Sequence, residues 1–288
     1  MTILVTAASG QFGHLVIDAL LRRGVAPEEI VAGARTVAKA DDLAAQGVRV
    51  VPFDYDTPES LGATLGGVDT LLLVSGSEPG ARLAGHRNVI AAAKKSGVGR
   101  LVYTSLAQAD TSTLVLAPDH AATEEAIAES GIPSTILRNN WYIENYLPDV
   151  SRAAETGVIA SSVGDARVAA ASRADYAEAA AVVVTEDGHE GRVYELTGDT
   201  AFTYAELAAA GAQVVGRDVA YVSLDRAVFE KAMTDAGLDA GTAGFVGELE
   251  AGIARGDLAQ VDPTLARLLG RPTTGLVEAL RAALPTLA

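Results

Sequence analysis

The sequence contains no cysteine. This absence excludes disulfides, thiolate metal ligands, iron–sulfur clusters and a cysteine nucleophile. Basic residues are also scarce: 22 Lys and Arg stand against 37 Asp and Glu, which gives a formal net charge of −15. Such a balance argues against nucleic acid, whose phosphates need compensating positive charge, and against an anionic membrane surface.

Long hydrophobic runs are absent as well. The longest unbroken apolar run covers residues 179–184, far short of the roughly 20 residues that a transmembrane helix needs. The apolar residues 2–8 resemble the start of a signal peptide, but no basic residue precedes them and a glycine-containing turn follows at once. We interpret them as a buried strand and expect a cytoplasmic protein that does not bind membranes.

What the sequence does contain is a regular alternation of two kinds of segment over its first 137 residues. Short apolar segments predict strands at residues 3–6, 30–32, 48–51, 70–74, 100–104 and 134–137. Helical periodicity lies between them at residues 11–23, 37–46, 58–65, 82–95 and 119–130. This alternation predicts βαβ units with right-handed crossovers, and therefore an α/β fold with a doubly wound parallel sheet buried on both faces.

The pattern changes after Leu137. A polar-aromatic stretch at 139–146 is followed by expected strands at 168–171 and 193–196, a helix at 175–185, and a mostly helical remainder with one strand at 219–222. We predict a Rossmann-like domain formed by residues 1–138 and about 167–199. A smaller, mostly helical substrate domain would comprise residues 139–166 and 200–288.

A glycine-containing turn joins the first strand to the first helix. Such a turn lets a pyrophosphate approach the free N–H groups and positive dipole end of the helix. The candidate cofactor-binding residues here are Thr6, Ser9, Gly10, Gln11, Phe12 and Gly13. Ala7 stands where the first glycine of such a loop is usual; because alanine resists positive φ, we expect ordinary backbone there. The alternative is a plain tight turn.

The second strand indicates which dinucleotide binds. An NAD site usually has an acidic residue at the end of this strand. Here Arg35 occupies that region, with Lys39 one turn further on, and guanidinium and ammonium groups suit a 2′-phosphate. We therefore predict NADP(H), with Asp54 after the third strand facing the adenine. The alternative is that Arg35 and Lys39 are solvated charges at a helix start.

Two further strand ends add candidates for cofactor binding. Ser75 and Gly76 follow the fourth strand, and Thr104 and Ser105 end the fifth, at the carboxyl edge where α/β sheets bind ligands. The alternatives are an ordinary turn for the first pair and helix capping for the second.

Several kinds of catalysis have no support in the sequence. No tyrosine is followed four residues later by lysine, so the usual proton relay of short-chain dehydrogenases is missing. The four histidines, at positions 14, 86, 120 and 189, show no paired metal-ligand spacing, and we expect no metal site. No G-x-S-x-G motif of an acyl hydrolase is present.

The sequence resembles the NmrA-like group of atypical short-chain dehydrogenases/reductases, and within it the bacterial type 2 NAD(P)H:quinone oxidoreductases. The motifs that carry the resemblance span nearly the whole chain: the loop at 6–13, Arg35 with Lys39, residues 103–105, 138–145, 172–177 and 188–196. Asn140 departs from the pattern, where glycine is expected.

The resemblance implies a two-domain oxidoreductase that binds NADPH and transfers hydride directly to a quinone, without flavin or metal. His120 begins the helix that lines the cleft in this family, where it could contact the nicotinamide ribose or donate a proton; the alternative is an exposed histidine at a helix start. Aromatic rings and amides suit a flat quinone, which makes Asn139, Trp141, Tyr142 and Asn145 the other catalytic candidates. An interdomain contact is their alternative role.

A second class of function stays open at this point. Some NmrA-like proteins are non-catalytic NADP(H) sensors that regulate a partner. The polar-aromatic run favours the enzyme, because a sensor needs no substrate cleft. A homodimer is also left open.

Overall fold

The computed structural model describes residues 1–76, 80 and 82–284 of the chain. They form two compact units. Unit 1 comprises Met1–Asp110, Pro118–Asn139 and Ala174–Glu195, and unit 2 comprises Thr111–Ala117, Asn140–Arg173 and Leu196–Ala288. Residues 111–117, 167–173 and 196–199, which we predicted in the first domain, fall in unit 2, and Asn139, which we predicted in the second, falls in unit 1. The predicted end of the substrate domain, at 285–288, lies outside the described residues.

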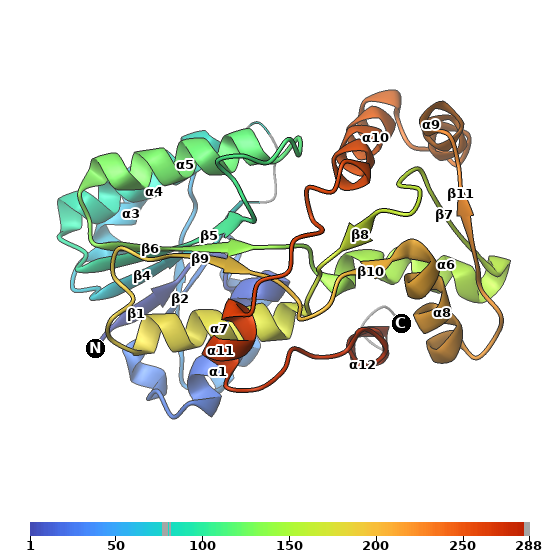
Figure 1. Cartoon of the computed structure of the whole chain (residues 1–288). Coiled ribbons are helices and arrows are strands. Elements are labelled where there is room, and N and C mark those ends of the chain that lie inside the picture. The colour runs from blue at the N-terminus through green and yellow to red at the C-terminus, as the bar shows by residue number, and fades with distance from the viewer. Residues whose placement is uncertain (77–79, 81, 285–288) are drawn as a thin grey trace. The chain divides into compact units, whose positions relative to one another are not determined.

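Unit 1 is built on a seven-stranded sheet (Figure 1). Its strands are β1 (Ile3–Val5), β2 (Ile30–Ala34), β3 (Arg49–Pro52), β4 (Thr70–Leu73), β5 (Arg100–Leu106), β6 (Ser134–Asn139) and β9 (Val193–Leu196), in the order β3-β2-β1-β4-β5-β6-β9. The six strands from β3 to β6 pair in parallel. Strand β9 continues the parallel arrangement, since Ile136 N donates to Arg192 O and Asn140 N to Leu196 O. The predicted doubly wound sheet is confirmed.

Helices cover both faces of this sheet. Figure 1 shows α3 (Pro58–Leu65), α4 (Arg82–Ser96) and α5 (Ala117–Ser130) on one face, and α1 (Gln11–Arg22) and α7 (Arg173–Thr185) on the other. Every residue of β1, β2, β4 and β5 is buried, as expected of a sheet covered twice. The helix predicted at 37–46 is interrupted: a 3-10 turn, Val37–Ala40, precedes α2, Asp41–Ala45.

The chain changes direction along the sheet between β1 and β4. From β1 it runs to β2 and β3 on one side, and from β4 to β5 and β6 on the other. At such a switch point the loops on the carboxyl side of the two central strands diverge, leaving room for a ligand. The carboxyl ends of β1 and β4 are therefore where unit 1 is expected to bind a ligand.

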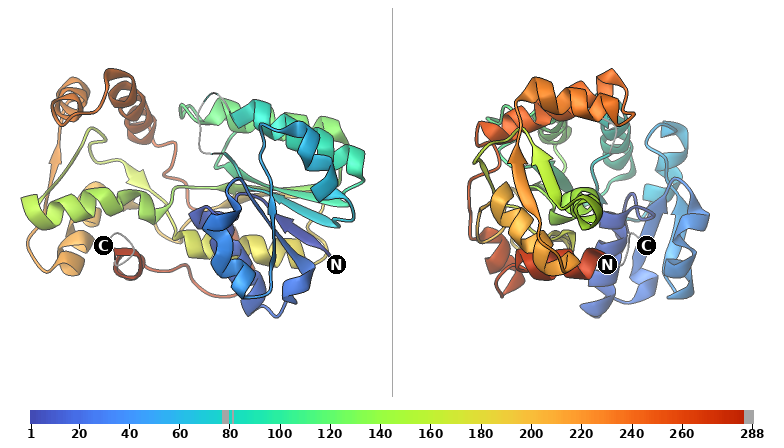
Figure 2. Two further views of the ribbon diagram at one scale, coloured as in Figure 1. Left: turned by 180° about the vertical axis from the view of Figure 1, so that it is seen from behind. Right: turned by 90° about the vertical axis from the view of Figure 1, so that its right-hand side faces the viewer.

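Unit 2 is mostly helical, as predicted. Its helices are α6 (Leu147–Thr156), α8 (Tyr204–Val215), α9 (Arg226–Asp235), α10 (Ala240–Ala254), α11 (Thr264–Leu269) and α12 (Leu276–Ala283). Strand β8 (Arg167–Val168) pairs antiparallel with β10 (Phe202–Thr203). The strand predicted at 219–222 forms as β11 (Ala220–Ser223), and Figure 2 shows it beside β7 (Val158–Ser161). We did not predict β7, whose four residues alternate between exposed and buried.

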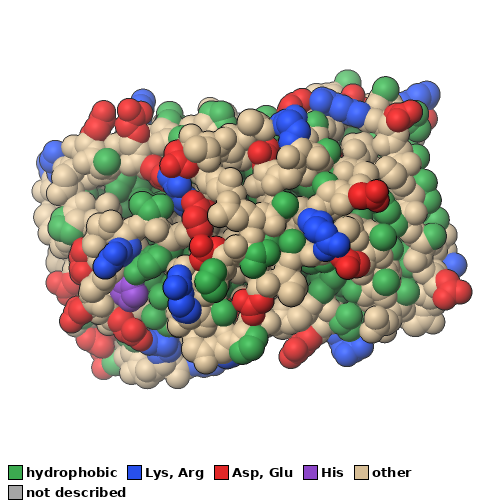
Figure 3. All heavy atoms as spheres, in the orientation of Figure 1, with side chains coloured by type: hydrophobic (Ala, Val, Ile, Leu, Met, Phe, Trp, Pro, Cys, Tyr) green, Lys and Arg blue, Asp and Glu red, His purple; other side chains and the backbone are tan. Residues whose placement is uncertain are grey.

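Charges of both signs lie on the face of the molecule that Figure 3 draws. Acidic and basic side chains are interspersed there. Among the described residues, no helix is long and apolar enough to cross a membrane.

Candidate functional site

The turn between β1 and α1 brings backbone segments unusually close together. An added Cβ on Gly13 would lie 2.5 Å from the carbonyl oxygen of Ala7 and 2.9 Å from that of Thr6, so only glycine fits. Ala7 has a φ of 50°, so our expectation of ordinary backbone there was wrong. The turn adopts the left-handed conformation, and an alanine occupies it at a cost of about 1–2 kcal/mol.

Helix α1 begins directly after this turn. Gly10 is its N-cap, which leaves the first turn without a side-chain cap among the described residues, and the first turn carries no acidic residue. Gly10 and Gln11 are exposed, Ser9 is half-buried, and Phe12 is buried and anchors the helix. The positive end of the helix dipole at this N terminus attracts an anion.

The ends of β2 and β3 carry the residues that we predicted for the adenosine half. Arg35 and Lys39 are both exposed, directly after β2 and in the 3-10 turn that follows. Asp54 is half-buried after β3, and its carboxylate accepts a hydrogen bond from the Asp56 backbone at 3.2 Å.

Thr6 has an internal role. Its hydroxyl accepts from Val74 N at 2.9 Å and contacts the Tyr55 hydroxyl at 2.5 Å, while Tyr55 donates to Val74 O at 2.7 Å. Since Tyr55 donates its hydrogen to Val74, the Thr6 hydroxyl is the donor to Tyr55. This closed set of bonds ties the end of β1 to the end of β4 and fixes the spacing of the switch point. Tyr55 was not predicted as part of the site.

Hydrogen bonds to β5 and α4 hold the segment that follows β4. Ser75 N donates to the Thr104 hydroxyl at 2.9 Å, and Gly76 N donates to His86 Nε2 at 3.0 Å. Thr104 and Ser105 are buried inside β5, so neither caps a helix.

Ser105 belongs to a charged network at the ends of β5, β6 and β9. Its hydroxyl donates to Glu124 at 2.5 Å, and the same carboxylate binds Arg138 through two bonds of 3.0 and 2.7 Å. Arg138 also donates to Asp110 and Glu195, at 2.9 and 3.1 Å. The bond to Glu124 contributes most to raising the pKa of Arg138. Arg138 stood in a predicted motif, but no feature of the sequence indicated that three carboxylates would converge on its guanidinium.

His120 lies in the interior rather than at an exposed helix start: it is only 6% exposed. Its Nε2 lies 2.8 Å from Arg82 Nη1, and its Nδ1 lies 2.9 Å from the Tyr103 hydroxyl. Arginine can only donate, so Nε2 is an acceptor and the ring proton sits on Nδ1, facing Tyr103. Burial, reinforced by the charge of Arg82, lowers the pKa of His120 to about 3. The ring is therefore neutral near pH 7.

The polar-aromatic run is divided between the two units. Asn139 ends β6 in unit 1, where it is buried and its backbone carbonyl accepts from Ala107 N at 3.0 Å. Trp141, Tyr142 and Asn145 belong to unit 2 and are half-buried.

Arg173 brings two of these unit 2 residues together. Its guanidinium lies 5.2 Å from the centre of the Tyr142 ring, and its Nη2 donates to Asn145 Oδ1 at 3.0 Å. Its backbone N–H is fixed by the carboxylate of Glu144, at 2.9 and 3.0 Å. Arg173 stood in a predicted motif, but its contact with the polar-aromatic run could not be read from the spacing.

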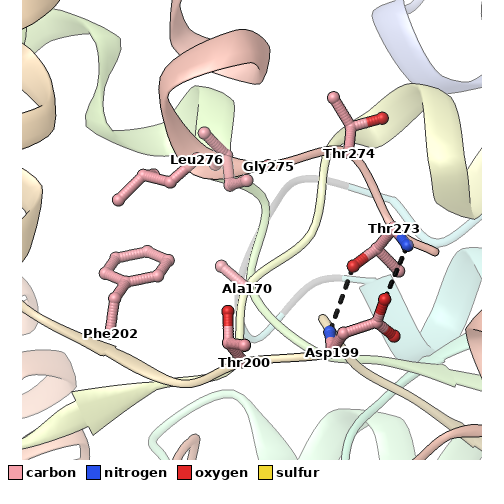
Figure 4. A pocket seen from close by; sticks show the side chains of 9 residues that line it. Ala170, Asp199, Thr200, Phe202, Thr273, Thr274, Gly275 and Leu276 are labelled. Atoms are coloured by element: carbon pink, nitrogen blue, oxygen red, sulfur yellow. Dashed lines mark hydrogen bonds between the residues drawn. The ribbon is translucent and has the colours of Figure 1, made fainter.

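Unit 2 also contains a cavity of about 260 Å³ (Figure 4). Ile143, Phe202 and Leu276 form its apolar part. Asp199 and Thr273 join two of its walls through reciprocal bonds of 2.7 and 3.1 Å, drawn in Figure 4. None of our predicted site residues lines it.

The strand order, the switch point and the close turn before α1 define a Rossmann-type dinucleotide-binding protein. The comparisons with known proteins specify this class further. The chain belongs to the NmrA-like family, whose model matches residues 1–250.

One related sequence and two solved structures show how far the similarity extends. Quinone oxidoreductase 2 of Escherichia coli is 48% identical over 278 residues, 96% of this chain and 97% of the relative. The structure of an NADPH-dependent quinone oxidoreductase of E. coli complexed with NADPH has a TM-score of 0.93 at 47% identity, covering 98% of this chain and 99% of that chain. A Citrobacter sp. triphenylmethane reductase complexed with NADP(H) has a TM-score of 0.93 at 36% identity, over 98% and 100%.

Proposed function

We propose that this protein is an NADPH-dependent quinone oxidoreductase that transfers hydride directly, without flavin or metal. The observation that carries the proposal is the turn between β1 and α1, where Gly13 packs against the Ala7 carbonyl and the first turn of α1 carries no acidic residue. The turn lies at the switch point of the sheet, and relatives that cover nearly the whole chain carry quinone oxidoreductase as their name.

The residues of unit 1 fit a bound NADPH. The pyrophosphate would accept from the first N–H groups of α1, and the 2′-phosphate would pair with the exposed Arg35 and Lys39. Asp54 would face the adenosine half. The nicotinamide half would then lie over the ends of β4 and β5, which carry Ser75, Gly76, Thr104 and Ser105. Thr6 acts indirectly, by tying β1 to β4.

The reaction has a simple balance. NADPH, when bound, supplies the hydride, and quinone plus hydride plus one proton gives hydroquinone. The first product is an aromatic phenolate, which is far more stable than an alkoxide and needs little help from an acid. This accounts for the missing tyrosine–lysine pair and assigns the protein mainly the task of positioning the two reactants.

In this scheme the contacts of His120 fit a structural role better than the role of a proton donor. Its one ring proton is held between Nδ1 and Tyr103, and its Nε2 accepts from Arg82. A ring whose pKa is about 3 carries no second proton to give near pH 7. We therefore propose that His120 supports β5 through its hydrogen bond to Tyr103 and that solvent supplies the proton.

The quinone would contact the polar-aromatic run. Within unit 2, Trp141 offers a flat indole face, and the amide nitrogen of Asn145 is a donor suited to a quinone carbonyl. The Asn145 amide is oriented by Arg173, which binds its oxygen and so directs its NH₂ group away from Arg173. Tyr142 lies under the same guanidinium, and we assign it the lesser role of supporting Arg173.

Purified, colourless and metal-free protein tests the proposal. Mixed with NADPH and a simple quinone, it should oxidise NADPH and form hydroquinone in a one-to-one ratio. Activity that appears only after flavin is added would show that direct transfer is wrong. Tight NADPH binding with no oxidation by any quinone would instead support a non-catalytic NADP(H) sensor.

A further inference from the structure

A second buried histidine, His86 on α4, lies directly beneath the segment that follows β4. Its side chain is fully buried, and its Nε2 accepts the Gly76 N–H at 3.0 Å. On the other side of the ring, Nδ1 lies 3.0 Å from the hydroxyl of Thr123 on α5. His86 thus connects the end of a central strand to two helices.

The hydrogen bonds fix the protonation of this ring. A hydroxyl has one hydrogen, and that of Thr123 is donated to Asp119 O at 2.8 Å. Thr123 must therefore accept from His86, so Nδ1 carries the proton and Nε2 is free to accept from Gly76. Burial, with the nearby charge of Arg82, lowers the pKa of His86 to about 4, which keeps Nε2 an acceptor near pH 7.

Aromatic neighbours prevent the ring from turning. The centre of the Tyr55 ring lies 6.0 Å from that of the His86 ring, and the centre of the Tyr103 ring lies 5.5 Å from it, both edge to face. Tyr55 is itself bonded to Val74 O, and Tyr103 to His120. The acceptor at Nε2 is therefore held at one position under Gly76.

The bond to Gly76 also orients the peptide that joins it to Ser75. This peptide is trans, so its N–H and its C=O point in opposite directions. Because the Gly76 N–H points to the buried His86 on α4, the Ser75 carbonyl points away from α4. That carbonyl, at the end of β4 and at the switch point, is an acceptor for a hydroxyl donor such as a ribose.

We propose that His86 is a positioning residue for the nicotinamide half of the cofactor, acting through the Gly76 N–H to aim the Ser75 carbonyl at a ribose hydroxyl. The inference rests on the NADPH-dependent reaction proposed above. His86 contacts neither reactant in this scheme; it sets the orientation of a peptide that contacts the cofactor.

Two substitutions of His86 separate its two bonds. In His86→Gln the side-chain oxygen reaches the position of Nε2, so the Gly76 bond is kept and the Thr123 bond is lost. In His86→Asn the amide lies at the position of Nδ1, so the Thr123 bond is kept and the Gly76 bond is lost. Thr123→Val is the matched control, because it removes the same bond as His86→Gln and leaves the ring in place.

The expected readouts differ between these variants. His86→Asn should weaken NADPH binding and lower kcat/KM for NADPH, each about tenfold, the usual effect of one lost buried hydrogen bond. His86→Gln and Thr123→Val should stay within about twofold of the wild type in both quantities. KM for quinone should be unchanged in all three. Thermal unfolding of each variant shows that the comparison is made on folded protein.

Equal NADPH affinity in His86→Asn and His86→Gln, or equal losses in both, would overturn the inference. Affinity is measured by direct titration, so the result stands even if the wild type oxidises no NADPH, an outcome that would contradict only the proposed function. Should His86→Asn fail to fold, nitrogen NMR of the wild-type histidines decides: a proton on Nε2 of His86 overturns the inference, and a proton on Nδ1 supports it.

Discussion

Replacing Ala7 by glycine should stabilise the protein, which is unusual for a change at a tight turn. The left-handed φ of 50° costs an alanine about 1–2 kcal/mol relative to ordinary backbone. Glycine avoids this cost but loses about 0.5–1 kcal/mol through the greater freedom of the unfolded chain. Losing the half-buried methyl group of Ala7 costs a few tenths of a kcal/mol more, about half of the ~0.8 kcal/mol that a buried methylene contributes. We expect a net gain of about 0.5 kcal/mol.

The complementary substitution, Gly13→Ala, should do the opposite. Its Cβ would lie 2.5 Å from Ala7 O and 2.9 Å from Thr6 O. Both are backbone atoms and cannot move aside, so α1 must shift away from β1. We expect a loss of about 1–3 kcal/mol in stability, and NADPH binding at least about tenfold weaker because the shift opens the pyrophosphate turn.

Urea unfolding of both variants measures these changes, with Gly62→Ala as the control. An added Cβ on Gly62, in α3, meets nothing within 4 Å, so that variant should gain about 0.5–1 kcal/mol from helix propensity alone. Ala7→Gly should leave NADPH affinity within about twofold. A loss of more than about 1 kcal/mol in Ala7→Gly, or a Gly13→Ala protein as stable as the wild type, would refute the account of this turn.

Three further predictions concern the cofactor, the quinone and pH. Arg35→Ala should weaken NADPH binding by roughly 1.5–3 kcal/mol and leave NADH unaffected; parallel titrations with the two cofactors decide, and equal weakening would remove Arg35 from the site. Trp141→Ala and Asn145→Ala should each lower kcat/KM for quinone while NADPH affinity changes by under ~0.5 kcal/mol; unchanged quinone kinetics in both would make this stretch an interdomain contact. Burial raises the pKa of Glu250 from 4.5 to about 7, so the folded state binds this proton more tightly than the unfolded state, and wild-type stability falls as pH rises through that interval. In the wild type the backbone N–H and the hydroxyl of Ser162 donate to Glu250, and a glutamine can still accept these bonds. Glu250→Gln should therefore remove the fall, and its stability should exceed that of the wild type by about 1–3 kcal/mol at pH 8 but not near pH 5. Urea unfolding at both pH values is the check, and a variant whose pH profile runs parallel to the wild type would contradict it.

The order of elements in unit 1 could be predicted because a parallel sheet leaves a simple pattern. Strands buried on both faces are short apolar runs, and the crossover helices between them have an equally clear period. The same regularity located the strand ends, and with them Arg35, Ser75 and Thr104. The strand β7 was not predicted because its partner, β11, lies far away in the sequence. Four alternating residues without a neighbouring partner strand resemble the end of a helix.

The internal connections of the site could not be predicted. His86 reaches Gly76 and Thr123, which lie 10 and 37 positions away, and Arg138 reaches Glu195 at a distance of 57. Such bonds depend on how the folded elements pack, and one sequence contains no periodic signal for them. The positive φ of Ala7 was missed for a related reason: alanine disfavours it locally, and the contact with Gly13 overrides that preference.

The most direct test of the central claim is a single-turnover reaction with NADPH carrying either hydrogen or deuterium at the transferred C4 position. The flavin-free protein, loaded with one equivalent of each form, is mixed with a simple quinone, and the loss of reduced nicotinamide absorbance is followed. Direct hydride transfer predicts complete oxidation in one turnover, slower with deuterium, and no flavin absorbance at any time. The claim would be contradicted if the hydrogen and deuterium forms of NADPH were oxidised at equal rates with no hydroquinone formed. It would also be contradicted if NADPH were oxidised only after flavin was added.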